Sequence, residues 1–200
     1  NNNLVDHLVL VSTDPDWAGT SLDATICAGQ LFDLEGAVQG VTYNSEPSGD
    51  FGEGLFIPDD QSQCFSAELT FTAFSPGATI ENANSDIVDI FINFEHSFMG
   101  DLTITFICPN GQSMAVHQQG GGGTNLGVPD QMDGTGPGTG WDYWWSPLAT
   151  NGTWAENATG QLPSGTYESA QPFTLLEGCP LNGTWEIEVC DSWAADDGYI

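Results

Sequence analysis

The 200-residue chain contains 28 Asp and Glu residues but no Lys or Arg, which gives a formal net charge of −28. No carboxylate can therefore pair with a permanent cation of its own chain, so each must be solvated, bonded to backbone N–H groups or bound to a divalent cation. Nucleic acids and anionic bilayers are bound through Lys and Arg. The charge excludes nucleic-acid partners, and because no run approaches the ~20 apolar residues that span a bilayer, we expect no membrane insertion.

The chain is nevertheless expected to fold, because 40% of its residues are hydrophobic and 11% are aromatic, which is too rich for a disordered acidic segment. Its 25 Gly and 11 Pro residues interrupt short apolar runs and leave no room for long helices. Most runs alternate apolar and polar residues, as in a strand with one buried face. The pattern predicts an all-β sandwich with strands at His7–Ser12, Leu31–Leu34, Ala67–Phe74, Asp89–Phe94, Leu102–Cys108, Ser113–His117 and Thr184–Cys190.

A change of composition divides the chain. Between Val41 and Pro58, glycines, a proline and acids follow one another closely, as in a linker or long loop. We expect residues 1–57 to form a short strand-rich lead-in, or a partial immunoglobulin-like segment, with this linker. Residues 58–200 then form the main sandwich. A second irregular stretch, Gly120–Gly140, is predicted to be a long loop that runs into the aromatic segment Trp141–Trp145.

The chain has five cysteines, and they are scattered. No Cys-x-x-Cys pair is present and no His lies at zinc-finger spacing, so disulfides are the better interpretation and an oxidising, extracellular setting follows. We predict the pairs Cys27–Cys64 and Cys179–Cys190. The odd count leaves one thiol that is free or paired outside the segment.

Two separated motifs resemble the signature of the proprotein convertase P domain. The first is Phe94–Ile104, which contains His96 and Gly-Asp-Leu, followed by Cys108–Gly111. The second is Leu181–Val189 with Asp191 and Asp196–Gly198. The resemblance covers about residues 58–200 and implies a jelly-roll β-sandwich of the galactose-binding-like type. Members of this family usually close with a further strand after the Asp-Gly turn, so the sandwich is expected to be truncated before its last strand.

Three further strings are similar to those of P-like modules in large bacterial cell-surface proteins exported by the type IX system of gliding bacteria. They are His117–Gly123, Trp145–Pro147 and Gly165–Ser169. This similarity implies a module of a secreted or surface-attached adhesive protein on a bacterial cell surface.

His96 and Gly100 are expected to have structural roles, with the imidazole hydrogen-bonded to a carboxylate or to backbone where it fixes a turn. Asp101 follows this glycine, and further acids lie near residue 191. If these acids meet at one end of the sandwich, calcium is the natural occupant, because carboxylate and carbonyl oxygens suit it and no internal cation competes. The candidate calcium ligands are Asp101, Asp191, Asp196 and Asp197.

The aromatic segment at 141–145 has two interpretations. Exposed rings would stack on sugars or on a partner protein, whereas buried rings would fill one end of the sandwich. The candidate ligand-binding residues are Trp141, Tyr143, Trp144 and Trp145.

The sequence favours a protein that is not an enzyme, because its three histidines accompany no Gly-x-Ser-x-Gly or comparable nucleophile motif. We expect a non-catalytic structural or interaction module of a large secreted or cell-surface protein, such as a stalk, adhesin or assembly domain. Its partners would be other domains of the same long chain, other surface proteins or glycans. The alternatives are a carbohydrate-binding module using Trp141–Trp145 and an accessory P domain of a secreted protease. Calcium is the one cofactor expected.

Overall fold

The computed structural model describes residues 56–57, 64–130, 136–193, 196 and 198–200, and four isolated positions before residue 32. The chain divides into two units, Asn1–Ser45 and Glu46–Ile200, and every described strand belongs to the second. The predicted strand His7–Ser12, all but the first residue of Leu31–Leu34, and Cys27 lie outside the described residues.

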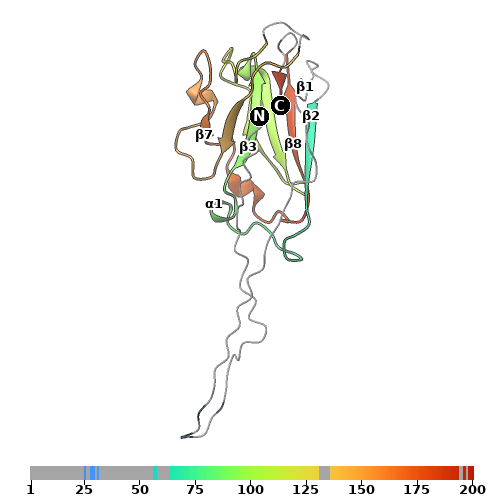
Figure 1. Cartoon of the computed structure of the whole chain (residues 1–200), viewed down its shortest axis with the longest axis vertical. Coiled ribbons are helices and arrows are strands. Elements are labelled where there is room, and N and C mark those ends of the chain that lie inside the picture. Colours follow the sequence, from blue (N-terminus) through green and yellow to red (C-terminus); the bar gives the residue numbers. More distant parts are fainter. Residues whose placement is uncertain are drawn as a thin grey trace, which may run out of the picture. The chain divides into compact units, whose positions relative to one another are not determined.

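Two sheets form a β-sandwich (Figure 1). The first sheet has the strand order β1-β9-β3-β6-β7 and the second has the order β2-β8-β4-β5. Neighbours are antiparallel except β6 and β7, which are parallel. The strands are β1 (Phe56–Ile57), β2 (Cys64–Phe71), β3 (Ile90–His96), β4 (Leu102–Ile107), β5 (Ser113–His117), β6 (Trp141–Trp145), β7 (Gly165–Tyr167), β8 (Gly183–Asp191) and β9 (Gly198–Tyr199).

Helix in the described residues is limited to single turns. They are α1 (Ala83–Asp86) and the 3-10 helices η1 (Met99–Asp101), η2 (Ala155–Asn157) and η3 (Phe173–Leu176). The predicted all-β sandwich is therefore confirmed.

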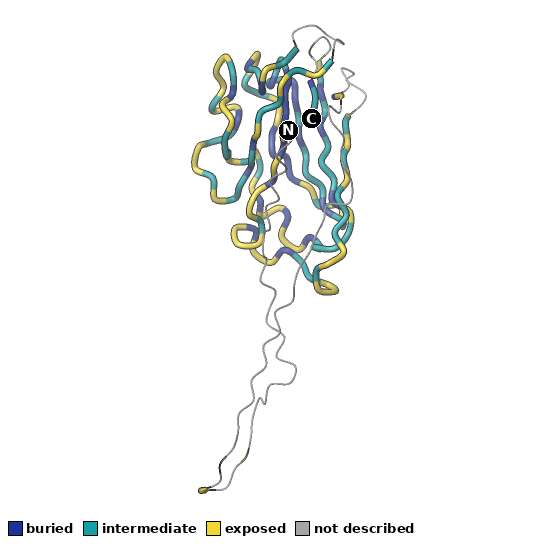
Figure 2. Tube along the Cα trace, in the orientation of Figure 1, coloured by how far each residue is buried: buried dark blue, intermediate teal, exposed yellow. Residues whose placement is uncertain are grey.

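The core lies between the sheets and follows the alternation of the sequence (Figure 2). In the register of β4 and β8, Ile104 lies opposite Val189, and both side chains are fully buried. Side chains of directly opposed residues point to the same face of a sheet. The Glu residues that alternate with the apolar residues along β8 therefore face outward. Burial of one apolar face in each sheet is the main stabilising contribution to such a fold.

Several predicted strands match the observed ones within three residues at each end, and Ser113–His117 matches at both ends. Strand β1 lies two residues before the predicted start of the sandwich and pairs with β9 through Phe56 and Tyr199, so the sandwich includes residues placed in the lead-in. The domain division itself stays a prediction. Strand β9, at the expected place of the final strand, consists of two residues.

The disulfides differ from the predicted pairs. Cys64 is bonded to Cys190 and Cys108 to Cys179, so both predicted pairings are wrong. Cys64 and Cys190 lie directly opposite each other in the register of β2 and β8. Cys179 precedes β8, and this strand carries Cys190 about 24 Å from its first residue at ~3.4 Å per residue, so the two nearest cysteines in sequence cannot meet.

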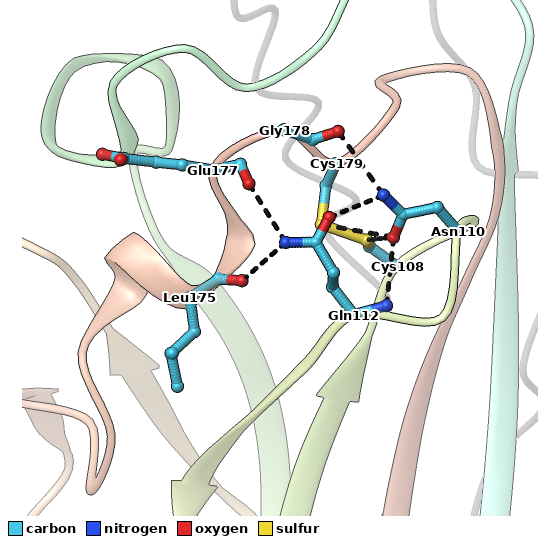
Figure 3. Close-up of a disulfide and its surroundings, with 7 residues drawn as sticks. All are labelled: Cys108, Asn110, Gln112, Leu175, Glu177, Gly178 and Cys179. Atoms are coloured by element: carbon cyan, nitrogen blue, oxygen red, sulfur yellow. Dashed lines mark hydrogen bonds between the residues drawn. A yellow bond between two sulfur atoms is a disulfide. The ribbon is translucent and has the colours of Figure 1, made fainter.

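The Cys108–Cys179 disulfide joins the turn after β4 to the segment after η3 (Figure 3). Gln112 donates two hydrogen bonds from its side-chain amide, to the carbonyls of Leu175 (3.1 Å) and Glu177 (3.0 Å). Asn110 fixes the turn by accepting the Gln112 N–H at 3.0 Å. The crosslink is thus supported by a polar network that contains no charged group.

We expect removal of either disulfide to destabilise the sandwich. The double variants Cys108→Ala/Cys179→Ala and Cys64→Ala/Cys190→Ala should each lower the free energy of unfolding by about 2–5 kcal/mol, because the bonds close chain separations of 71 and 126 residues in the unfolded state. Urea unfolding measures the change. Non-reducing peptide mapping after cleavage at Glu and Asp should yield these two pairs, and a Cys179–Cys190 peptide would contradict the structure.

Candidate functional site

Polar side chains gather at one end of the sandwich, where β3 ends and β8 ends. His96 is the last residue of β3, Asp101 ends η1, and Asp191 is the last residue of β8. Asp191 lies opposite Leu102 in the register of β4 and β8, and the Asp101 carbonyl accepts the Ser192 N–H at 3.2 Å. The ends of three elements therefore place these residues together.

His96 and Asp191 form a fully buried pair in which Nε2 of the ring lies 3.2 Å from Oδ2 of the carboxylate. Nδ1 of His96 accepts the backbone N–H of Phe98 at 3.1 Å, so Nε2 carries the proton and donates to Asp191. The second carboxylate oxygen accepts the N–H of Trp193 at 3.0 Å. Both ring nitrogens are occupied, so His96 has no lone pair available for general-base chemistry.

Asp101 is a carboxylate at this end of the sandwich whose pKa is raised. Burial raises its pKa, and the negative charges of Asp191 and Asp196 raise it further, while His96 acts in the opposite direction. Asp196 in turn accepts a hydrogen bond from the Ser97 hydroxyl at 3.1 Å. Three of the four predicted calcium ligands are thus close enough to interact electrostatically, and Asp197 lies outside the described residues.

These residues are chemically suited to a hard divalent cation. Carboxylate oxygens of Asp101, Asp191 and Asp196 are the ligand type that calcium prefers, and a bound cation would offset the repulsion that raises the pKa of Asp101. The carboxylates do not form a tight three-ligand cluster among the described residues; the one such group there is Cys64, Glu188 and Cys190. That group cannot bind a metal through thiolates, because its two sulfurs are joined in a disulfide.

Gly100 lies where two backbone segments pack closely together. Its N–H donates to the Gly122 carbonyl at 2.9 Å, and its own carbonyl accepts the Gly120 N–H at 3.1 Å. A Cβ atom at Gly100 would lie 2.8 Å from the Cα of Gly122. The glycine run at 120–123 therefore packs its backbone directly against the turn that follows His96.

The aromatic segment at 141–145 is strand β6, a strand that the sequence analysis missed. Tyr143 and Trp145 are fully buried, and Trp141 packs against the core. The Tyr143 hydroxyl accepts the Gly127 N–H at 2.8 Å and donates to the Leu162 carbonyl at 3.2 Å, and burial raises its pKa to about 12. The prediction that Tyr143 and Trp145 bind a ligand is wrong, because neither ring reaches solvent.

Trp144 is the member of the segment on the outward face. Its ring lies 5.2 Å, centroid to centroid, from that of Phe91, which is 52% exposed. Beside them, the Asn93 side-chain amide donates to Asp142 at 2.7 Å. Phe91 and Asn93 were missed as candidate ligand-binding residues. In the register of β3 and β6, these two residues lie opposite Trp144 and Asp142.

Comparison with known families gives one match. Residues 85–162 match the family model of the proprotein convertase P-domain. This part of the sandwich, which includes β3 to β6, is thus similar to a P-domain. No match is found among curated proteins or among solved structures.

The P-domain match begins in α1, before β3, and ends at Leu162, just before β7, so it includes His96, Gly100 and Asp101. The second motif, Leu181–Val189, lies outside the matched range but forms most of β8, beside β4 of the matched part.

P-domains are accessory, non-catalytic domains. The two disulfides fit an extracellular setting. Among the described residues, no helix has the length and apolarity needed to cross a bilayer.

A second buried histidine makes the sandwich sensitive to acid. Nε2 of His117 donates to the Met99 carbonyl at 3.1 Å, and the ring packs 5.2 Å from that of Trp154. Burial lowers the pKa of His117 from 6.5 to about 4. The folded state therefore binds fewer protons than the unfolded state between these values, and the free energy of unfolding falls as pH drops from 6.5 towards 4.

We expect the variant His117→Gln to reduce this acid sensitivity. Between about pH 7 and pH 4.5, wild type should lose about 2–3 kcal/mol more of its free energy of unfolding than the variant. Urea unfolding over this pH range measures the difference, and the comparison cancels titration of the carboxylates that both proteins share. Equal pH profiles would show that His117 takes up its proton normally in the folded state.

Proposed function

We propose that this P-domain is a non-catalytic structural or interaction module of a large secreted or cell-surface protein, where it serves as a stalk, adhesin or assembly domain. The observation that carries the proposal is the bonding of His96, whose two ring nitrogens are committed to Phe98 and Asp191. The groups that would supply acid–base chemistry instead hold the end of the sandwich together. Other domains of the same protein or other surface proteins are the proposed partners.

Calcium is proposed as a structural ion at the end formed by Asp101, Asp191 and Asp196. The support is electrostatic, because burial and the negative charges of Asp191 and Asp196 raise the pKa of Asp101, and the chain has no Lys or Arg to compensate them. A divalent cation would supply positive charge and bind oxygen ligands without disturbing the contact between His96 and Asp191. It would stabilise the fold rather than react.

Thermal unfolding with calcium and with a chelator tests this proposal. Calcium at about 100 times its dissociation constant should stabilise the fold by about 2.7 kcal/mol, which raises Tm by several degrees. The variant Asp101→Asn should lose most of the shift. The matched control Glu68→Gln removes one exposed charge from the middle of β2, away from the strand end that carries Asp191, and should keep the shift. No shift in wild type, or equal shifts in both variants, would contradict a calcium site at Asp101.

A second candidate function, carbohydrate binding, is favoured by exposed Phe91 and half-buried Trp144, which lie together beside Asn93 and Asp142. Aromatic rings with neighbouring amide and carboxylate groups are suited to stack on and hydrogen-bond a sugar ring. Wild type and the variant Trp144→Ala can be compared on a glycan array, with Leu148→Ala as a control at another exposed apolar residue. Binding that only Trp144→Ala removes would support this function, and no binding by wild type would exclude it.

A further inference from the structure

Two rows of side chains lie on the outward face of the first sheet. Tyr143 points into the core, so its neighbours along β6, Asp142 and Trp144, point outward. In the register of β3 and β6, Phe91 lies opposite Trp144 and Asn93 lies opposite Asp142. One row is therefore aromatic and the next is polar, and they are about 7 Å apart along the strands at ~3.4 Å per residue.

The polar row lies in an open hollow of about 390 Å³, which Gly140, Trp141 and Ser164 also line. The Asn93 side-chain amide donates to Oδ1 of Asp142 at 2.7 Å. Gly140 leaves room for this amide, because a Cβ atom at Gly140 would clash with the side-chain oxygen of Asn93. The backbone of β6 and the amide of β3 thus hold the carboxylate in place beside the hollow.

Asp142 keeps one carboxylate oxygen for a ligand. Among the described residues, its side chain makes a single hydrogen bond, to Asn93. The nearby Ser164 hydroxyl donates to the backbone carbonyl of Asp142, at 2.6 Å, and not to the carboxylate. The chain has no Lys or Arg that could approach this oxygen. A ligand that carries its own positive charge would therefore meet no competing side chain of that kind.

Charge selects the kind of sugar that this face can accept. With a formal net charge of −28, the protein repels glycans that carry carboxylate or sulfate groups. A protonated amino group is attracted by the same field, and it forms a charge-assisted hydrogen bond with a carboxylate. Aromatic faces also attract cations, so the row of Phe91 and Trp144 favours the same ligand as Asp142 does.

We propose that these two rows bind glycans built from amino sugars with free amino groups, such as oligomers of glucosamine. The apolar face of one pyranose ring stacks on Trp144 beside Phe91. The ammonium group of the sugar donates to the carboxylate of Asp142. This inference rests on the carbohydrate-binding candidate and deepens it, because it specifies the class of sugar and the residue that selects it.

An amino sugar suits the two rows better than a Lys side chain of a partner protein does. The ammonium group of the sugar is fixed to the ring that stacks, so one rigid unit reaches the aromatic row and the polar row together. A Lys side chain would lose more conformational entropy when it is immobilised. It would also offer a smaller apolar surface to the two aromatic rings.

The test compares four ligands by NMR titration. Three are tetramers of glucosamine, N-acetylglucosamine and glucose with the same linkage, and the fourth is acetylated tetralysine amide. Sugar amines are protonated and carboxylates are ionised at about pH 5.5, and about 0.15 M NaCl screens the diffuse field of the protein. The glucosamine tetramer should bind about fivefold tighter than the other three, with the largest shifts at Phe91, Asn93 and Trp144.

Variants of the protein test the role of the carboxylate. Asp142→Asn keeps an acceptor for the Asn93 amide but removes the charge, so it should weaken binding of the glucosamine tetramer by about threefold. It should leave binding of the glucose tetramer within about 1.5-fold. The control Glu68→Gln removes one exposed charge from β2 of the second sheet and should change neither affinity by more than about 1.5-fold.

The contrary outcomes separate this inference from the function on which it rests. Equal affinities for the glucosamine and glucose tetramers, or equal losses in the two variants, would overturn the inference and leave the carbohydrate-binding candidate standing. No binding of any glycan would overturn both. Tetralysine that binds as tightly as the glucosamine tetramer would identify a basic peptide as the ligand and would overturn the assignment to amino sugars.

Discussion

The fold has to hold its carboxylates without a permanent cation, because the chain contains 28 acids and no Lys or Arg. The described residues show two ways of doing so. Asp191 is buried against the Nε2–H of His96 and a backbone N–H, and Asp86 accepts the N–H groups of Glu81 and Asn82, which lower its pKa. Elsewhere, apolar packing between the sheets and two disulfides hold the structure. At the end of the sandwich that carries Asp101, burial and the charges of Asp191 and Asp196 raise the pKa of this carboxylate. A divalent cation is therefore proposed there.

The architecture could be predicted from the sequence where one face of a strand is buried and the other is solvated. Leu102–Ile107 and Gly183–Asp191 alternate in this way, and they became neighbouring strands. Strand β6 could not be predicted from alternation, because aromatic residues occupy both of its faces: Trp145 is buried, while Trp144 lies over Phe91. The disulfides could not be predicted from cysteine spacing, because the pairing of Cys64 with Cys190 depends on strand register and not on distance along the chain.

The site could be predicted in part. His96 and Gly100 were expected to be structural from their place at a turn. In the structure His96 pairs with Asp191, and a Cβ atom at Gly100 would meet the backbone of Gly122. The sequence named a meeting of Asp101 with the acids near residue 191 as the condition for a calcium site, and it does not determine whether their oxygens are near enough to share an ion. Phe91 was not found, because a single aromatic residue in a strand carries no sign of the face to which it points.

The central claim is that charges in this P-domain repel one another and that salt bridges contribute almost nothing to its stability. The most direct test is the midpoint of thermal unfolding as a function of NaCl concentration at about pH 7.5, with chelator present to remove divalent cations. Raising NaCl from about 10 mM to 500 mM shortens the Debye length from about 30 Å to about 4 Å and screens the repulsion. The account predicts that Tm rises steadily over this range. A Tm that falls as salt is added would show that attractive ion pairs stabilise the fold, and would contradict it.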